Sequence, residues 1–459
     1  MRHLLFATAA LLSAPALAAP AATDWHAEGR AIYEHAITVP TVAGRGQTPA
    51  LAAWLKERFA AGGLTDVVIK PYDGEAALIL RWKAEGKPVK KPVLLLAHMD
   101  VVEAKAEDWS RDPFRLVEEG GYFYGRGTID DKQGVTAITT ALLRLKAEGF
   151  RPKRDIIVLF TGDEETDGKG ADLAATEWRD LIDAEYALNA DAGGGAKDED
   201  GKMLGFVLQT SEKTYADYTF TVHNSGGHSS RPRPDNAIYE LADGLKALAA
   251  YRFTPMLDDT TRAYFQERQK AEKGALGDAM RRWLANPEDG DAADAVEADP
   301  MEVGGTRTRC VATRLEGGHA NNALPQSAVA NVNCRIFPGV TPQAIEQELQ
   351  AVAGPKVTVK LVGAPKYAGA SPLTPEVLNA YTRTVHKRFP GATIIPKMEA
   401  GATDGLYLRA VGIPTYGVDG AWIVAPQDER AHGKDERMPV KAFYDELDHW
   451  RDLIAAVAG

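Results

Sequence analysis

The sequence predicts an α/β protein in which one domain has a mixed, mostly parallel central sheet flanked by helices, and an α+β lid domain is inserted into it. Apolar runs of strand length, residues 93–98 and 155–160, are each followed by acidic or imidazole side chains, and residues 134–148 between them have helical periodicity. From about residue 213 the pattern changes to short strands and polar loops, and the first pattern returns near residue 371. We therefore expect the first domain, which would carry the functional site, to be discontinuous along the chain.

The chain length favours two domains, because 459 residues are too many for one modest core. We predict a signal peptide at residues 1–18, a catalytic domain at 19–212 and 365–459, and a lid and dimerisation domain at 213–364. The composition, with 45% hydrophobic and 25% charged residues, is ordinary for a globular protein. The net charge of −11 argues against a general role in binding nucleic acid or anionic membranes.

The N-terminus has the pattern of an export signal. Arg2 precedes the apolar run Leu4–Leu12, and the small residues of Ala16–Ala18 favour cleavage before Ala19. An uncleaved membrane anchor is the alternative, but the apolar run is short for a membrane span. We expect an exported protein, periplasmic or secreted, with no stable membrane span after cleavage of the signal.

Export would place two cysteines in an oxidising compartment. Cys310 and Cys334 flank a predicted hairpin with arms near residues 306–315 and 327–337. Facing positions on such a hairpin allow a disulfide, but the sequence does not supply the Cα separation that a disulfide requires. A disulfide and two buried thiols therefore both stay open.

The predicted elements of the first domain follow from apolar periodicity and from glycine or proline at their ends. The expected helices are at residues 24–39, 49–61, 134–148, 375–389 and 440–457. The expected strands are at residues 67–70, 77–82, 93–98, 155–160, 186–188, 392–396 and 414–418.

The lid domain is predicted from a different pattern, with about four strands and two helices. Residues 218–222 are typical of an edge or meander strand, and residues 258–300, which are polar, acidic and rich in alanine, indicate a helical insertion. The other expected elements are a loop at 226–232, a helix at 237–251, the hairpin described above and a helix at 341–352.

Five side chains of metal-binding type lie on predicted loops. Two divalent ions a few ångströms apart need several anionic or imidazole ligands and usually one bridging carboxylate. Nitrogen and oxygen ligands without thiolate fit Zn²⁺, with Mn²⁺ or Co²⁺ as substitutes. The candidate ligands are His98, Asp130, Glu165, Asp191 and His432.

Two further carboxylates have candidate roles next to these ligands. Glu164 adjoins Glu165, so one loop would give one carboxylate to a metal ion and another to the attacking water as a base. Asp100, two residues after His98, would orient its imidazole ring. Taken singly, each motif has an ordinary alternative: a structural His–Asp pair, a solvated acidic turn, a helix N-cap at Asp130, an exposed loop histidine. Their joint occurrence at successive strand ends favours the metal site.

These motifs resemble those of the co-catalytic dizinc exopeptidases and amidases, a family that includes carboxypeptidase S, aminoacylase, acetylornithine deacetylase and succinyl-diaminopimelate desuccinylase. The resemblance covers nearly all of the chain after the signal peptide and rests on residues 98–100 (HMD), 125–132 (GRGTIDDK), 163–165 (DEE) and 431–433 (AHG). It implies two Zn²⁺ per chain. Residues 191–194 (DAGG) depart from the Asp-Glu-Gly form expected in the carboxypeptidase S branch.

The resemblance also implies a role for each candidate. Asp130 would bridge the two ions, and the peptide bond that follows it is often cis in the family. Asp191 and His98 would bind one ion. Glu165 and His432 would bind the other ion, and Glu164 would be the general base.

On the lid, His228 matches the family histidine that reaches the substrate carbonyl, often from the partner subunit of a dimer, which implies a homodimer through the lid. Asn322 and Arg335 match positions that hold polar groups of the substrate, and an arginine grips a carboxylate bidentately. Gly401 and Thr403 match a segment that lines the substrate side. A strand-surface charge at Arg335 and an ordinary turn at Gly401 are the alternatives.

We therefore expect a zinc-dependent metallopeptidase of exopeptidase, carboxypeptidase or dipeptidase type, which hydrolyses an amide bond in small peptides. The alternative is a deacylase of N-acyl amino acids, because the same machinery serves both substrates. A third hypothesis is a catalytically decayed exported protein that binds zinc or peptide. The presence of both Glu164 and Asp100 argues against it, since a binding protein needs neither.

Overall fold

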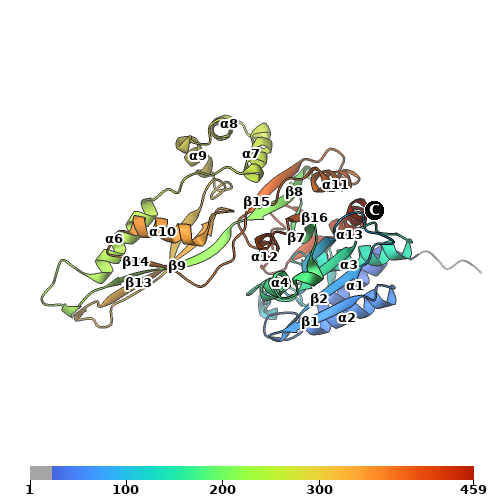
Figure 1. The fold of residues 1–459 in the computed structure, drawn as a ribbon, viewed down its shortest axis with the longest axis horizontal. Coiled ribbons are helices and arrows are strands. Elements are labelled where there is room, and N and C mark those ends of the chain that lie inside the picture. The colour runs from blue at the N-terminus through green and yellow to red at the C-terminus, as the bar shows by residue number, and fades with distance from the viewer. Residues whose placement is uncertain (1–22) are drawn as a thin grey trace, which may run out of the picture.

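The structure is a computed structural model that describes residues 23–459. The predicted signal peptide, residues 1–18, lies outside the described residues. Figure 1 shows a larger body built on one sheet, from which a long arm with a second sheet extends, and a group of helices beside the junction.

The larger body contains an eight-stranded sheet in the order β1-β2-β6-β3-β7-β16-β8-β15. The pairs β3–β6, β3–β7, β7–β16 and β8–β15 are parallel, and the other pairs are antiparallel, so the predicted mixed sheet is confirmed. The strands are β1 (Val67–Tyr72), β2 (Glu75–Trp82), β3 (Val93–His98), β6 (Ile156–Thr161), β7 (Tyr186–Lys197), β8 (Met203–Glu212), β15 (Ile394–Glu399) and β16 (Thr415–Val424).

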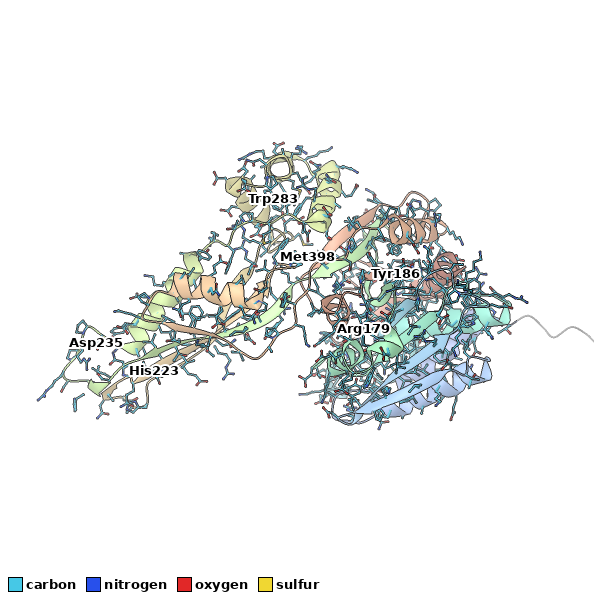
Figure 2. All side chains as sticks on the ribbon, viewed as in Figure 1. Arg179, Tyr186, His223, Asp235, Trp283 and Met398 are labelled. Atoms are coloured by element: carbon cyan, nitrogen blue, oxygen red, sulfur yellow. A yellow bond between two sulfur atoms is a disulfide. The ribbon has the colours of Figure 1, made fainter. Side chains whose placement is uncertain are left out.

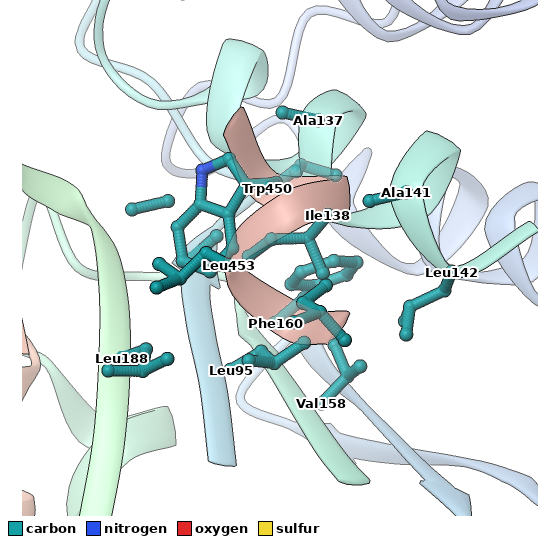
Figure 3. Close-up of a cluster of buried hydrophobic side chains, with 14 of the residues drawn as sticks. Leu95, Ala137, Ile138, Ala141, Leu142, Val158, Phe160, Leu188, Trp450 and Leu453 are labelled. Carbon is teal, nitrogen blue, oxygen red and sulfur yellow. The ribbon is translucent and has the colours of Figure 1, made fainter. Parts of the chain in front are cut away.

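Strand β3 lies inside this sheet and is buried along its whole length, which explains its uninterrupted apolar sequence. Its side chains alternate between the two faces. Leu95 packs into the main hydrophobic core, whereas Leu94 and Leu96 pack into a smaller core on the opposite face. Figure 3 shows Leu95 among side chains of β6, β7 and the two helices α3 and α13.

Helices cover both faces of the sheet. Those that contribute to the main core are α1 (Trp25–Thr38), α2 (Thr48–Ala61), α3 (Lys132–Ala147), α11 (Pro375–His386) and α13 (Val440–Ala458). Those that contribute to the opposite core are α4 (Lys169–Ala175), α5 (Arg179–Ile182) and α12 (Gly405–Ala410). A small sheet, in the order β17-β5-β4, and a short 3-10 helix complete the body, with β4 (Val117–Glu119), β5 (Tyr122–Tyr124), β17 (Arg437–Pro439) and η1 (Ala106–Asp108).

The arm contains a four-stranded antiparallel sheet in the order β11-β13-β9-β14, here called the lid sheet. Two helices pack on it and enclose a separate hydrophobic core. The elements are β9 (Thr214–His223), β11 (Arg309–Gly317), β13 (Ser327–Ile336), β14 (Thr358–Leu361), α6 (Ala237–Ala250) and α10 (Pro342–Ala353). A two-stranded ribbon is formed by β10 (Gly227–His228) and β12 (Ala323–Leu324). The predicted domain boundaries stay a prediction.

One strand prediction is wrong, and several strands were not predicted. The predicted edge or meander strand at 218–222 is wrong about the edge, because β9 lies between β13 and β14. The alternating burial of β9 shows that one face of the strand is covered. It does not show whether other strands pair with β9 on one edge or on both. Strands β8 and β14 were not predicted. β8 joins β9 through the single residue Lys213, so one extended segment passes from the large sheet into the lid sheet (Figure 1).

The predicted helical insertion is confirmed as three helices, α7 (Asp259–Ala271), α8 (Gly274–Ala285) and α9 (Gly290–Glu297). They enclose a small core around Phe265, Met280 and Trp283. Asp258 caps α7 by accepting the backbone N–H of Thr261 at 2.8 Å. The insertion lies beside β15 at the junction of body and arm (Figure 1).

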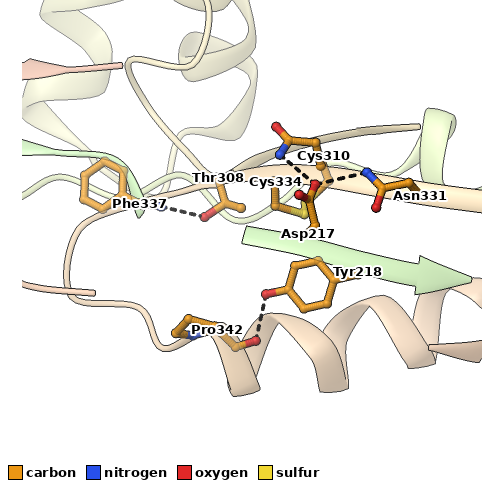
Figure 4. Close-up of a disulfide and its surroundings, with 9 residues drawn as sticks. Asp217, Tyr218, Thr308, Cys310, Asn331, Cys334, Phe337 and Pro342 are labelled. Atoms are coloured by element: carbon orange, nitrogen blue, oxygen red, sulfur yellow. Dashed lines mark hydrogen bonds between the residues drawn. A yellow bond between two sulfur atoms is a disulfide. The ribbon is translucent and has the colours of Figure 1, made fainter. Parts of the chain in front are cut away.

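A disulfide joins Cys310 of β11 to Cys334 of β13, which answers the question that the sequence left open. The two residues are direct partners in the antiparallel register, and their Cα atoms are 4.1 Å apart. The bond therefore ties the outer strand of the lid sheet to its neighbour, as Figure 4 shows.

Within residues 23–459, no helix combines the length and the apolar composition that a span across a bilayer requires.

Asp419 of β16 and Glu446 of α13 form a carboxyl pair in the body, linked by a hydrogen bond between their side chains. Burial raises the pKa of both groups, and the charge of Asp419 raises that of Glu446 further. The folded pair therefore holds its proton to a higher pH than the unfolded chain does, so stability falls as the pH rises above the unfolded pKa values.

We expect Asp419→Asn to make the unfolding temperature less dependent on pH between 4.5 and 8.5, because an amide N–H replaces the shared proton. The difference at the upper end should reach about 1–2 kcal/mol. This range lies above the titration of the buried His449, whose pKa burial lowers to about 3. Thermal denaturation of the two proteins, with the exposed Asp200→Asn as a control, checks the expectation. Equal slopes in all three proteins would contradict it.

Candidate metal centre

His98, the last residue of β3, brings an imidazole to the carboxyl end of the large sheet. The ring is buried, with 1% of the residue exposed. Its Nδ1 lies 3.1 Å from the carbonyl oxygen of Asp100, which only accepts hydrogen bonds, so Nδ1 carries the proton. In the neutral ring this leaves the lone pair of Nε2 free for a metal ion.

Asp130 lies between two histidines. Its Oδ1 is 2.9 Å from Nε2 of His98, and its Oδ2 is 3.0 Å from Nε2 of His432. The peptide bond between Asp130 and Asp131 is cis, as the resemblance implies. Because the two oxygens of one carboxylate face two different imidazoles, Asp130 has the arrangement of a bridging ligand.

Each histidine faces a second carboxylate. Nε2 of His432 lies 2.9 Å from Oε2 of Glu165, and Nε2 of His98 lies 3.5 Å from Oδ1 of Asp191. The other oxygen of Glu165, Oε1, is buried without a hydrogen-bond partner. A buried acceptor of this kind needs a donor or a cation, so the site is incomplete as a purely protein network.

The arrangement fits a pair of divalent ions. Ligand atoms around a tetrahedral Zn²⁺, about 2.0–2.1 Å from the metal, are about 3.3 Å from one another, which is the range found here. Candidate ligand atoms of His98, Asp130 and Glu165 lie within 4.8 Å of one another, and so do those of His98, Glu164 and Asp191. All five predicted ligands therefore converge, although Glu164 is also close enough to bind an ion.

The electrostatics of the cluster favour a cation. Burial raises the pKa of Asp191 to about 7, although His98 opposes this. Burial and the charge of Asp191 raise the pKa of Glu164 well above its usual range. The carboxylates of Asp130 and Glu165, which accept hydrogen bonds from the His432 ring, raise the pKa of His432 to about 10. The cluster thus holds protons that a divalent ion would displace on binding.

Asp100 fixes the turn that carries the predicted base. Its Oδ1 accepts the backbone N–H of Glu164 at 3.1 Å, and its Oδ2 accepts that of Glu165 at 3.0 Å. Oδ1 also lies 3.5 Å from Nδ1 of His98. One buried carboxylate therefore positions both the first histidine and the acidic turn.

The cluster opens into a groove of about 970 Å³. Asp130, Glu164 and His432 line it on the body, and Arg335 lines it from the lid sheet. The guanidinium of Arg335 lies over the Tyr215 ring, 4.9 Å from its centre. One N–H of that guanidinium donates to Ala400 O at 3.3 Å, which leaves other donors for a ligand.

Gly401 and Thr403 also line the groove, as the sequence predicts. The Thr403 hydroxyl donates to Glu212 at 2.9 Å, so this contact occupies its hydrogen. Gly401 has no atom within 4 Å of the position that a Cβ would take, so this part of the wall is open.

His228 and Asn322 do not join the cluster within one chain. Both are exposed, and they are neighbours, because Ser229 N–H donates to Asn322 O at 3.0 Å. His223 and Asp235, which precede and follow β10, lie at the end of the arm farthest from the large sheet (Figure 2). A role for His228 at the metal centre would need a movement of the arm or a second subunit.

Two buried residues behind the cluster were missed by the sequence analysis. Arg126 and Glu436 form an ion pair with a nitrogen-to-oxygen distance of 2.6 Å, and both are at most 2% exposed. Glu436 follows Lys434 and Asp435, so it resembles a member of a solvated charged loop. The only signal in the sequence is the arginine between Gly125 and Gly127, which needs a counter-charge if that motif is buried.

We expect removal of bound metal to lower the unfolding temperature by several degrees, because the carboxylates of the cluster would lose their counter-charge. At a zinc concentration of 100 times the dissociation constant, each occupied site contributes about 2.7 kcal/mol. Thermal denaturation after dialysis against a chelator, and again after addition of Zn²⁺, measures this. Mg²⁺, which imidazole ligands bind poorly, is the control and should restore less. An unfolding temperature that does not respond to either ion would contradict the expectation.

Comparison with known proteins gives one family. The model of peptidase family M20/M25/M40 matches residues 94–456. The human N-fatty-acyl-amino acid synthase/hydrolase PM20D1 is 29% identical over 379 residues, which are 80% of this chain and 74% of the human protein. Rat aminoacylase-1A is 28% identical over 442 residues, which are 93% of this chain and 94% of the rat protein.

A solved structure with the same fold is that of the M20 family metallo-carboxypeptidase Sso-CP2 from Sulfolobus solfataricus. It superposes with a TM-score of 0.69 at 18% identity, over 94% of this chain and 99% of the other. At this identity the similarity shows the fold, including the predicted α/β class.

Proposed function

Because the chain belongs to peptidase family M20/M25/M40, and is thus a hydrolase of metallopeptidase or aminoacylase type, we propose that it cleaves an amide bond next to an amino acid with a free carboxylate. The first candidate substrate is a small peptide, cleaved as by a carboxypeptidase or dipeptidase. The observation that carries the proposal is that the metal-binding cluster and Arg335 line one groove.

Different residues of this groove would bind the metal ions and the carboxylate of the substrate. The carboxylates and imidazoles at its base are suited to hold two Zn²⁺, with Mn²⁺ or Co²⁺ as substitutes. When bound, such ions supply Lewis acidity and lower the pKa of water. Arg335 offers a planar set of donors to the carboxylate of the substrate, which would place the amide next to it at the cluster.

The protein residues then carry the proton transfers. Glu164 takes a proton from the water whose oxygen attacks the amide carbon, and delivers it to the leaving nitrogen as the C–N bond breaks. Asp100 holds Glu164 in place through its backbone N–H and orients His98. His228 donates to the oxyanion that develops on the substrate carbonyl, once it is brought to the groove.

N-acyl amino acids are the second candidate substrate. This candidate is favoured by the relatives, since the human protein is named for N-fatty-acyl-amino acids and the rat protein is an aminoacylase. Both candidates share the free carboxylate and the amide nitrogen of an amino acid, and differ only in the acyl part. A decayed zinc- or peptide-binding protein is disfavoured because Glu164 and Asp100 keep the positions that catalysis requires.

We propose further that the protein is exported, periplasmic or secreted, and that it forms a homodimer through the lid. Export is supported by the pattern of residues 1–18 and by the Cys310–Cys334 disulfide, which is typical of an oxidising compartment. The dimer is supported by the outer strand β11, whose Val311 and Leu315 are exposed.

A matched panel tests the proposed function. Zinc-loaded protein is given dipeptides, N-acyl amino acids, and the C-terminal amides of both. We expect zinc-dependent hydrolysis of the free acids, and much slower hydrolysis of the amides, because the amides lack the charge that Arg335 binds. Cleavage of dipeptides indicates the first candidate, and cleavage confined to acyl substrates indicates the second.

Arg335→Ala should raise KM for the free acids at least tenfold and leave the slow reaction of the amides unchanged. Arg314→Ala is the matched control, because Arg314 is an exposed arginine on the neighbouring strand β11. Absence of zinc-dependent hydrolysis of every panel member, or equal rates on acids and amides, would contradict the proposed function.

A further inference from the structure

We propose that Glu436 and Arg126 are positioning residues, which hold the segment that carries Asp130 against the loop that carries His432 so that both face one metal ion. The inference rests on the proposed function. Neither side chain lines the groove, so both would act only through the two ligands.

Glu436 accepts hydrogen bonds from the backbone of the segment that carries Asp130. Its Oε1 accepts the N–H of Ile129 at 2.7 Å and that of Asp130 at 3.3 Å. Its Oε2 accepts the N–H of Gly127 at 3.3 Å, and its carbonyl oxygen accepts that of Gly125 at 3.1 Å. One fully buried residue therefore fixes the path of the chain up to the bridging aspartate.

Arg126 donates hydrogen bonds to the backbone of the loop that carries His432. Its Nη1 donates to Glu436 at 2.6 Å, while its Nη2 donates to the carbonyl oxygens of His432 at 3.2 Å and of Gly433 at 3.0 Å. The planar guanidinium thus joins the two ligand-bearing segments, which lie about 300 residues apart in the sequence. The guanidinium also lies over the Trp109 ring, 5.2 Å from its centre.

The loop that carries His432 needs such support. His432 has a φ of 62° and Asp435 a φ of 52°, in the left-handed region that residues other than glycine seldom adopt. The side chain of His432 is 56% exposed, so packing alone does not fix it. The hydrogen bonds of Arg126 to this loop supply the constraint that burial supplies for His98.

A buried ion pair is costly to form, and a hydrophobic pair of the same volume is often at least as stable. Here all four oxygen contacts of the Glu436 carboxylate go to the segment at 126–130, which includes a predicted ligand. We therefore assign to the ion pair the orientation of the metal ligands. Mutation of residues that hold metal ligands in place typically lowers metal affinity by 10–100-fold.

The test is a calorimetric titration of the metal-free full-length protein with Zn²⁺. We expect two sites in the natural protein. In Glu436→Gln, an amide nitrogen replaces one acceptor oxygen, and the affinity of one zinc site should fall 10–100-fold while the other stays unchanged. Arg126→Lys keeps the charge but cannot reach both loop carbonyls, and should weaken the same site, so it tests the inference if Glu436→Gln fails to fold.

Asp428→Asn is the matched control. Asp428 is a fully buried carboxylate whose Oδ1 lies 2.7 Å from Nη2 of Arg437, eight residues from Glu436, without a contact to the segment that carries Asp130. This variant should bind both zinc ions as the natural protein does. Excess zinc should restore the turnover of Glu436→Gln, which a loss of folding would not allow.

Unchanged affinity of both sites in Glu436→Gln and Arg126→Lys, or an equal loss in Asp428→Asn, would overturn the inference. The titration needs no substrate, so its outcome is separate from that of the hydrolysis panel. If the natural protein bound two zinc ions but hydrolysed no panel member, the proposed function would be contradicted. The zinc affinities of the variants would still test the positioning role of Glu436 and Arg126.

Discussion

Glu164→Gln should lower turnover by 10²–10⁴-fold while leaving both zinc ions bound. Glutamine keeps the size of the side chain but cannot take a proton from water at neutral pH. The carboxylate of Glu164 lines the groove next to the charge of Asp191, and Asp100 fixes its backbone, so the substitution removes the proton acceptor without disturbing the turn.

Metal analysis of the same variant decides between two roles. Candidate atoms of Glu164, His98 and Asp191 are close enough to share an ion, so loss of zinc from Glu164→Gln would make it a ligand instead of the base. The exposed Glu177→Gln, in the segment that follows α4, is the control and should keep both zinc content and turnover. Normal turnover in Glu164→Gln would rule out its assigned role.

Asp130→Asn should have the largest effect on metal binding. Two divalent ions about 3.5–4 Å apart repel each other by roughly 15–20 kcal/mol at an effective dielectric constant of 20. A shared carboxylate between them offsets part of this repulsion. Asparagine offers one weak oxygen ligand and no charge, so we expect zinc content to fall from two per chain to one or fewer, and turnover to fall at least 10³-fold.

The ligands that would bind only one of the two ions provide the comparison for Asp130. Glu165→Gln should weaken only the ion beside His432, and Asp191→Asn only the ion beside His98, so each should keep about one zinc per chain. Metal analysis after gel filtration in zinc-free buffer measures all three variants. Two zinc ions retained by Asp130→Asn would contradict its bridging position.

Most ligands of the centre were predictable because they lie at or near the ends of predicted buried strands. The apolar run that ends at His98 predicts a buried strand, and the carboxyl ends of neighbouring parallel strands meet at one edge of a sheet. β3, β6 and β7 are neighbours in the sheet, so His98 at the end of β3, the acidic turn after β6 and Asp191 within β7 converge. His432 follows no such strand: the sequence offers it as a histidine on a predicted loop, and the resemblance pairs it with Glu165 on one ion.

The supporting contacts were not predictable, because they depend on partners distant in the sequence. Glu436 and Arg126 each look like surface charges until the fold brings them together. β8 was missed for a similar reason: it ends at the buried Glu212, and Arg409 and Thr403, which contact Oε2 of Glu212, lie far away in the sequence. The position of β9 inside the lid sheet depends on β14, which carries little apolar signal.

The most direct test of the account is the anomalous scattering of zinc-loaded crystals, measured on both sides of the zinc absorption edge. We predict two zinc peaks about 3.5–4 Å apart, one on each side of the Asp130 carboxylate. One should lie beside His98 and Asp191, and the other beside Glu165 and His432. A single peak, or none between these side chains in a protein that still hydrolyses its substrate, would contradict the two-metal centre.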